Sequence, residues 1–280
     1  MDYCKLSETV DKFGHAGICI GTEKSQILKN SLLILQNENH FKKTFYWGRI
    51  NGIQADYQIA YGYKKDCLKD RIFFYSLDGL DWMLLPKSNK CSRYLTPLAM
   101  TLFEGNPSIV TNVLKNNIPF SPDDKSLEAF EGVMPNELKE EDRLATTVEM
   151  ITEESLVIPR GGFFKNPDGI ITEHPSYSGL NSTESIDLKS YLHARLPRKK
   201  WTENLLTRDD YNYSLDFLDP IEMDPLKESW NLQVYSAGHL VILQNLFWPG
   251  MTFYHIVDSP HYGSLYIGSG IKNLNVPFMI

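Results

Sequence analysis

The chain has 280 residues, of which 42% are hydrophobic and 22% are charged, as in an ordinary soluble globular protein. Its formal net charge of -7 argues against nucleic acid or an anionic membrane as a partner, because both select for a basic surface. The N-terminus lacks the regions of a signal peptide, and no apolar run approaches the length of a membrane span. The four cysteines show no zinc-binding spacing, so we expect reduced thiols in a cytoplasmic protein with no membrane partner.

Two helices are expected at the start of the chain. The first covers residues 6–13, and the second begins at an N-cap on Thr22. The second helix is amphipathic, and its apolar face carries Ile27, Leu28, Leu32 and Leu35.

The dipeptide Asn51-Gly52 is the strongest local signal, because it fits a two-residue type I′ hairpin turn. It lies between two runs of β-forming residues, 45–50 and 53–61. Pairing about this turn places Ile50 opposite Ile53 and Trp47 opposite Asp56. The prediction is a tight hairpin that opens an antiparallel meander, continued by strands over 72–77 and 81–85.

One face of this hairpin is mixed in character and carries Phe45, Trp47, Arg49 and Asp56. Arg49 and Asp56 are diagonal neighbours, close enough to form an ion pair. One interpretation is a surface ion pair beside a core tryptophan. The other is a subunit contact anchored by aromatic side chains.

The amino-acid composition changes after residue 104. Residues 105–135 are rich in proline and polar side chains, and they predict an irregular segment at a lobe boundary or one ordered by a partner. The organisation expected is therefore 1–104, 105–135 and 136–280, either as separate units or within one continuous domain. The last segment opens with a helix over 138–153, a buried strand over 156–158, and a second helix from Asn181 or Ser182 to just before Pro197.

The last fifty residues read as a second antiparallel meander. Trp248-Pro249-Gly250 is expected to join two of its strands, with Gly250 at positive φ and with Phe247 and Phe253 largely buried. The predicted fold class is α+β, an antiparallel β-sheet system with an N-terminal hairpin meander, a C-terminal meander and several packed helices.

The familiar catalytic signatures are absent from the sequence. His255 and His261 stand close in sequence and offer ligands or acid–base groups, which leaves open a hydrolase or small-molecule-binding β domain acting around His255. An acidic group lacks the pattern of a calcium loop and is interpreted as solvated loop or helix caps. Its members are Asp216, Asp219, Glu222 and Asp224.

Several blocks of the sequence resemble the radial spoke head protein 9 family of motile cilia and flagella. The resemblance runs from about Phe45 to the C-terminus and is weak over 6–36 and 105–135. The blocks are Trp47-Gly48-Arg49-Ile50, Ala55-Asp56-Tyr57, Ile158-Pro159-Arg160-Gly161, Leu215-Asp216-Phe217, Trp248-Pro249-Gly250, Phe253-Tyr254-His255 and Pro277-Phe278-Met279.

This resemblance implies a non-enzymatic subunit of the radial spoke head, located in the axoneme of the cilium or flagellum. It implies assembly with radial spoke head proteins 4 and 6, near radial spoke head protein 1, facing the projections of the central microtubule pair. It implies no cofactor, catalytic residue or metal. The residues expected at a partner interface are Phe45, Trp47, Arg49, Asp56, Trp248 and Tyr254.

Overall fold

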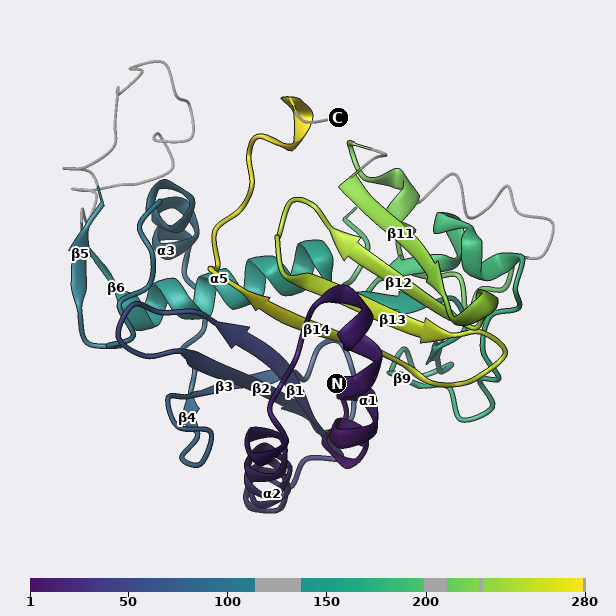
Figure 1. Ribbon diagram of the computed structural model, residues 1–280, viewed down its shortest axis with the longest axis horizontal. Coiled ribbons are helices and arrows are strands. Elements are labelled where there is room, and N and C mark those ends of the chain that lie inside the picture. The colour runs from purple at the N-terminus through teal and green to yellow at the C-terminus, as the bar shows by residue number, and fades with distance from the viewer. Residues whose placement is uncertain (114–136, 199–210, 227–228, 279–280) are drawn as a thin grey trace.

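A single eight-stranded sheet forms the centre of the molecule (Figure 1). The computed structural model describes residues 1–113, 137–198, 211–226 and 229–278. The strand order is β11-β12-β13-β14-β1-β2-β3-β4, and every neighbouring pair is antiparallel except β1 and β14. Their bounds are β1 Lys43–Ile50, β2 Tyr57–Tyr63, β3 Ile72–Ser76, β4 Met83–Leu84, β11 Trp230–Tyr235, β12 Leu240–Asn245, β13 Met251–Ile256 and β14 Tyr262–Gly268. The α+β prediction is confirmed.

The C-terminal meander follows its sequence pattern closely. Gly250 has a φ of 102°, and Phe253 is buried, as expected for a tight turn between β12 and β13. Phe247 is only half-buried. The alternation of apolar residues and the turn chemistry were sufficient to predict this meander, because each of its strands pairs with its neighbour in sequence.

The predicted two-residue turn at Asn51-Gly52 is wrong. Ile50 pairs with Tyr57, so six residues connect β1 and β2. The backbone at Gly52 and Ile53 instead turns toward Phe103, whose carbonyl oxygen accepts from the Ile53 amide at 2.8 Å. A contact with a distant segment therefore determines the conformation of this connection, and local turn propensity does not predict such a contact.

The two meanders join through a parallel seam that the sequence did not reveal. Gly48 to Ile50 of β1 pair with Tyr266 to Gly268 of β14. At Gly48 the register of β1 against β2 shifts, φ is 146°, and a Cβ atom would lie 2.0 Å from the carbonyl oxygen of Tyr266. The seam thus requires glycine, and it makes residues 1–104 and 136–280 share one sheet.

The N-terminal residue extends this seam. The Met1 amine donates to the carbonyl oxygen of Tyr46 at 2.8 Å, and the amide of Tyr46 donates back to Met1 at 2.8 Å. The Met1 amine also lies 3.4 Å from the carbonyl oxygen of Ser264. Met1 therefore bridges β1 and β14 where the two strands separate.

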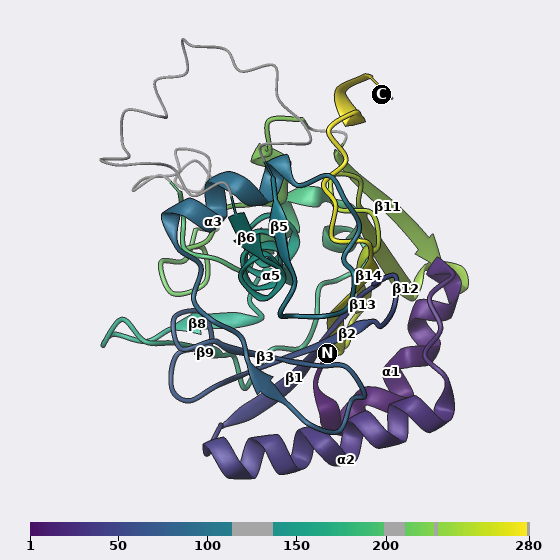
Figure 2. The same cartoon turned by 90° about the vertical axis from the view of Figure 1, so that its left-hand side faces the viewer.

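Two helices cover one face of the sheet (Figure 2): α1 Leu6–Phe13 and α2 Thr22–Asn39. Leu28, Leu32 and Leu35 are buried as predicted, whereas Ile27 is exposed. The N-cap is Gly21 rather than Thr22, and it makes no side-chain capping hydrogen bond. Buried residues of this layer include Leu6, Phe13, Leu28, Leu32, Leu35, Phe41, Tyr46, Ala60, Phe74, Tyr254 and Leu265.

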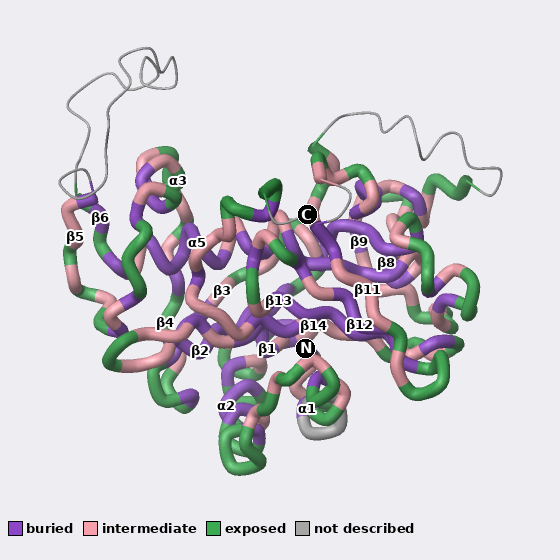
Figure 3. The backbone as a smooth tube through the Cα atoms, turned by 45° about the horizontal axis from the view of Figure 1, so that its top comes forward, coloured by how far each residue is buried: buried purple, intermediate pink, exposed green. Residues whose placement is uncertain are grey.

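The other face packs on helix α5 Glu140–Ser155, whose Leu144, Val148 and Ile151 are buried as their spacing predicted. Figure 3 shows that the central strands β12 and β13 consist largely of buried residues. Apart from short 3₁₀ turns, the described residues also form α3 Lys90–Leu95 and three two-stranded sheets: β5 Val110–Asn112 with β6 Glu137–Lys139, β7 Val157–Pro159 with β10 Tyr191–His193, and β8 Phe163–Lys165 with β9 Ile171–Glu173. Most of the segment 105–135 lies outside the described residues.

The helix predicted between Asn181 and Pro197 is wrong. Two short 3₁₀ turns, Glu184–Ile186 and Leu188–Ser190, lead into strand β10. Asp187 separates the turns, and its side chain caps the Lys189 amide at 3.0 Å. Pairing of β10 with β7 satisfies the backbone that a helix would have satisfied internally. Across the described ranges, no helix combines the length and apolar character needed to cross a membrane.

Candidate functional site

Trp47, a predicted interface residue, lies inside the protein. Its side chain is 3% exposed, and its indole Nε1 donates to Thr152 Oγ1 of α5 at 3.0 Å. Its ring also packs on Tyr266, with centroids 5.1 Å apart. The shift of register at Gly48 sends Trp47 to the α5 side of the sheet, away from Arg49.

Trp248 and Tyr254 are also buried. Trp248 Nε1 donates to Glu154 Oε2 at 2.8 Å, and that carboxylate also accepts from Lys272 at 2.7 Å. The Tyr254 ring meets Phe13 edge-on at 5.1 Å beneath α1. These contacts are internal, so neither side chain is available to a partner in the folded chain.

Phe45, Arg49 and Asp56 are the predicted interface residues that reach the surface. The predicted ion pair is confirmed, with Arg49 Nη1 3.6 Å from Asp56 Oδ2. Phe45 stacks on Tyr61 at 5.1 Å and borders a cleft on the α5 side, whereas Arg49 borders a cavity on the α1–α2 side. The structure therefore divides the six residues between two faces of the sheet. Their role as a partner interface stays a prediction.

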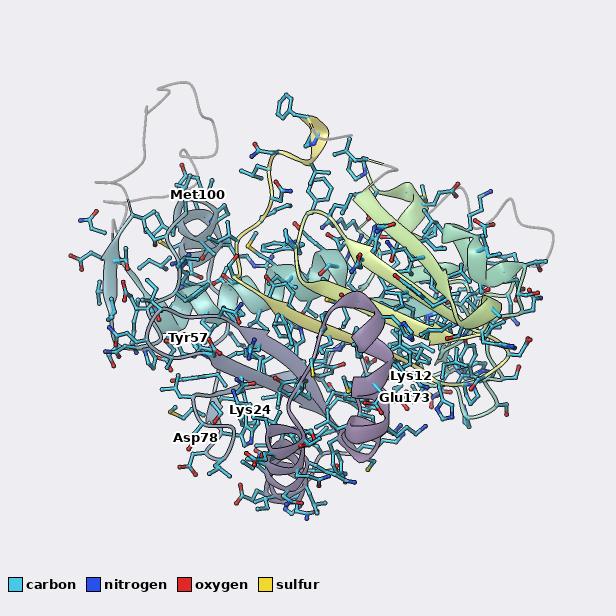
Figure 4. All side chains as sticks on the ribbon, viewed as in Figure 1. Lys12, Lys24, Tyr57, Asp78, Met100 and Glu173 are labelled. Atoms are coloured by element: carbon cyan, nitrogen blue, oxygen red, sulfur yellow. The ribbon has the colours of Figure 1, made fainter. Side chains whose placement is uncertain are left out.

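The cleft beside Phe45 has a volume of about 450 Å³ and lies where β1 and β14 separate. Two of its cationic side chains, Lys43 and Arg71, have partners within the chain. Lys43 pairs with Glu173, which is labelled in Figure 4 and also accepts from Tyr63 Oη at 3.0 Å. Arg71 donates to the carbonyl oxygens of Cys67 and Ala194 at 2.7 and 2.9 Å.

Cys67 is a thiol bordering this cleft, but it is poorly suited to nucleophilic chemistry. Burial, with the nearby Glu173 carboxylate, raises the pKa of its thiol to about 12. Its Sγ donates to the carbonyl oxygen of Ile171 at 3.0 Å. The protonated thiol therefore serves as a small buried side chain that anchors β9.

His255 is fully buried on β13. Its Nε2 lies 3.3 Å from Tyr177 Oη and accepts from the Leu180 amide at 3.4 Å. Burial lowers the pKa of the imidazole to about 4, so the ring is neutral at physiological pH. His261 is exposed, and its Nδ1 lies 3.2 Å from Lys5 Nζ. The two histidines thus engage different partners, and His255 holds the 177–180 segment against the sheet.

The acidic group near the C-terminal meander was predicted to be solvated loop or helix caps, and a solvated position is wrong for Asp216 and Asp219. Asp216 is 2% exposed and forms a bidentate pair with Arg160, at 2.6 and 2.8 Å. Asp219 accepts from Arg195 at 2.7 Å. Their basic partners lie far away in sequence, so no local sequence pattern predicts these ion pairs.

Asp224 completes this set. Its two carboxylate oxygens engage His193 Nε2 at 2.9 Å and Trp230 Nε1 at 2.8 Å. Burial alone raises the pKa of this carboxyl, but the hydrogen bonds and charge of its partners outweigh burial and leave the pKa lowered. Among the described residues, no three His, Cys, Asp or Glu side chains gather as a metal ion requires.

The contacts around the buried titratable groups described above are those of structural residues, and the comparisons with known proteins agree with the sequence resemblance. No protein-family model matches the chain. Along the whole of both chains it is similar to proteins named radial spoke head protein 9 homolog, at 36% identity over 281 residues in Danio rerio, 35% over 283 in Bos taurus and 34% over 283 in Homo sapiens. The chain belongs to the radial spoke head protein 9 family.

Proposed function

We propose that the chain is a non-enzymatic structural subunit of the radial spoke head in the axoneme of motile cilia and flagella. The observation that carries this proposal is the similarity to radial spoke head protein 9 homologs over the full length of both chains. The burial and internal pairing of Cys67, His255 and Asp224 support a structural role, because these groups hold the fold rather than face a substrate.

The partners we propose are radial spoke head proteins 4 and 6, with radial spoke head protein 1 nearby. In this position the chain helps to assemble the head and to relay signals from the central-pair projections to the dynein arms. The support is the family resemblance carried by the aromatic, Gly and Pro blocks that line the parallel seam and the C-terminal meander.

An exposed apolar surface offers a contact for such a partner. The turn between β3 and β4 rests on α2, where Ser31 Oγ donates to the carbonyl oxygen of Gly79 at 2.7 Å. Around this junction the two elements expose four large aliphatic side chains, which we call the α2–β4 patch: Ile27 (40% exposed), Ile34 (57%), Leu80 (57%) and Leu84 (59%).

The position of the α2–β4 patch favours an interface. Ile27 and Ile34 are seven residues apart and so share one side of the helix. Leu84 pairs with Phe74, whose side chain faces the same α2 layer. Because β4 is the edge strand, a partner that covers the patch also covers the open end of the sheet.

Replacing Ile34 and Leu80 by serine tests this contact. We expect the double variant to retain its far-UV circular dichroism spectrum but to lose most of its co-purification with co-expressed radial spoke head protein 4 or 6. The loss follows from the apolar area that the partner no longer buries. Ile186→Ser is the matched control, since Ile186 is 60% exposed on the 3₁₀ turn Glu184–Ile186.

Two outcomes count against the proposal at different levels. Normal co-purification of the double variant would reject the α2–β4 patch as the contact and shift attention to Phe45, Arg49 and Asp56, where Arg49→Ala with Asp56→Ala is the next variant. Failure of the unmodified chain to bind any spoke-head protein would reject the proposal that the chain is a subunit of the spoke head.

A further inference from the structure

Strand β11 forms one open end of the eight-stranded sheet, opposite β4 (Figure 1). It pairs with β12 without a break in register from Trp230 to Tyr235. The edge strand β4 has only two residues, whereas β11 has six and carries no proline or charged side chain. Shortness, charge, proline or a bulge usually keeps an edge strand from pairing with another chain. Strand β11 has none of these features.

The backbone of β11 presents hydrogen-bonding groups along its outer side. The Leu246 amide donates to the carbonyl oxygen of Ser229 at 2.9 Å, which fixes the alternation of the β11–β12 ladder. Every second residue from there to Tyr235 therefore bonds to β12. The amides and carbonyls of Leu232 and Val234 lie between and point away from β12. Within the part of the chain that the structure describes, these groups have no hydrogen-bond partner, so the edge is able to accept a further strand.

The side chains of β11 match those of a second β11 that runs antiparallel to it. When two copies pair about Leu232, the Trp230 ring faces Val234 of the second copy, which is 43% exposed before pairing. Aromatic and β-branched side chains form favourable pairs across strands. Asn231 faces Gln233 in the same register, and each of these amides is able both to donate and to accept. This complementarity, with no like charges in contact, favours a second copy of the chain as the occupant.

We propose that two copies of the chain associate through β11 to form a two-fold symmetric dimer with one continuous sheet across both copies. Backbone hydrogen bonds at Leu232 and Val234 join the two edge strands. A strand pair of this length is a small interface, so the association is reversible, with a dissociation constant on the order of 10 μM. The contact lies at the opposite end of the sheet from the α2–β4 patch, and it does not depend on the spoke-head role.

The test is sedimentation equilibrium of the purified full-length chain at loading concentrations from about 1 to 300 μM. We expect the mean mass to rise with concentration from that of one chain toward that of two. Asn231→Lys with Gln233→Lys places lysine opposite lysine at two positions and should weaken dimerisation at least about tenfold. Asn231→Lys with Gln233→Glu places opposite charges face to face and should restore or strengthen dimerisation.

The two double variants are matched controls for each other. Both lose the hydrogen bond from Asn231 Nδ2 to Gln244 Oε1 at 3.3 Å and the one from Tyr235 to Gln233. They differ only in the charge at position 233, so a difference in their dimerisation reports the pairing of the two strands and not a defect in folding.

A cysteine substitution locates the two-fold axis directly. In the proposed register Leu232 faces its own copy, at the Cα separation of about 5.5 Å that a disulfide spans. Leu232→Cys should therefore form a disulfide-linked dimer in oxidised glutathione. Val234→Cys, two residues along the same face, lies opposite Trp230 and should not. Both variants also carry Cys4→Ser and Cys19→Ser, because Cys4 and Cys19 are exposed thiols.

A chain that stays monomeric at every loading concentration overturns the proposal and leaves β11 to a strand of another protein. Equal dimerisation of the two double variants, or equal cross-linking of Leu232→Cys and Val234→Cys, also overturns it, because neither result is compatible with pairing about Leu232. None of these readouts involves a spoke-head protein, so their failure is distinct from failure of the proposed function.

Discussion

His255 shows how one buried side chain ties stability to pH. Its folded-state pKa is about 4, against about 6.5 in an unfolded chain. Between these values the unfolded chain binds one proton more than the folded chain. Stability contributed by the neutral ring is therefore complete above pH 6.5 and declines as the pH falls toward 4.

We expect this linkage to remove about 3 kcal/mol of unfolding free energy between pH 6.5 and 4. His255→Gln abolishes the titration, so urea unfolding measured across this range should show a slope smaller by close to one proton. Tyr177→Phe keeps the buried histidine and should retain the slope. An identical slope in His255→Gln and the unmodified chain would contradict this account.

Single residues were the hardest to place from sequence. The Arg49–Asp56 ion pair was predicted and is present, because it depends on local proximity. Trp47 was assigned to the same face as Arg49, but the register shift at Gly48 separates them. Asp216 was interpreted as part of a solvated loop or a helix cap, although it is buried beside Arg160. Its partner stands more than fifty positions away, and only tertiary structure brings the two together.

At the scale of elements, the pairing of the two meanders through β1 and β14 depends on one residue, Gly48. Gly48→Ala places a Cβ 2.0 Å from the Tyr266 carbonyl oxygen at a φ of 146°. Backbone is not able to move aside as a flexible side chain does, so we expect destabilisation of at least about 3 kcal/mol in thermal or urea unfolding.

Gly14→Ala is the matched control for Gly48→Ala. Gly14 has a φ of -55°, and a Cβ there meets nothing within 4 Å. The free energy of unfolding should change by no more than about 1 kcal/mol. Equal effects of the two substitutions would show that the seam does not depend on glycine.

Elements with a strong internal pattern were predictable. The helices α1, α2 and α5 and the C-terminal meander appear where the spacing of apolar residues predicted them. The prediction of a turn at Asn51-Gly52 is wrong because the Ile53 amide of this loop donates to the carbonyl oxygen of Phe103. The prediction of a helix after Asn181 is wrong because part of this segment forms β10, which pairs with β7. In both cases a contact from elsewhere in the chain outweighed a local preference.

For the whole molecule, the shared sheet predicts that both meanders unfold together. Strands β1 and β14 are neighbours at its centre, so opening either one exposes the same core. Native-state hydrogen exchange in mild urea should give the seam amides of β1 and β14 similar opening free energies. Complete exchange of β1 to β4 while β11 to β14 remain protected would show that the two halves are separate cooperative units.

The parallel seam also dictates the order of events when the chain is synthesised. Gly48 leaves the ribosome more than two hundred positions ahead of its partner Tyr266. Until then the edge of β1 from Gly48 to Ile50 has no strand to pair with. Such a long wait favours slow maturation and aggregation of nascent chains. Newly made chains are therefore expected to need chaperone protection until their final strand emerges.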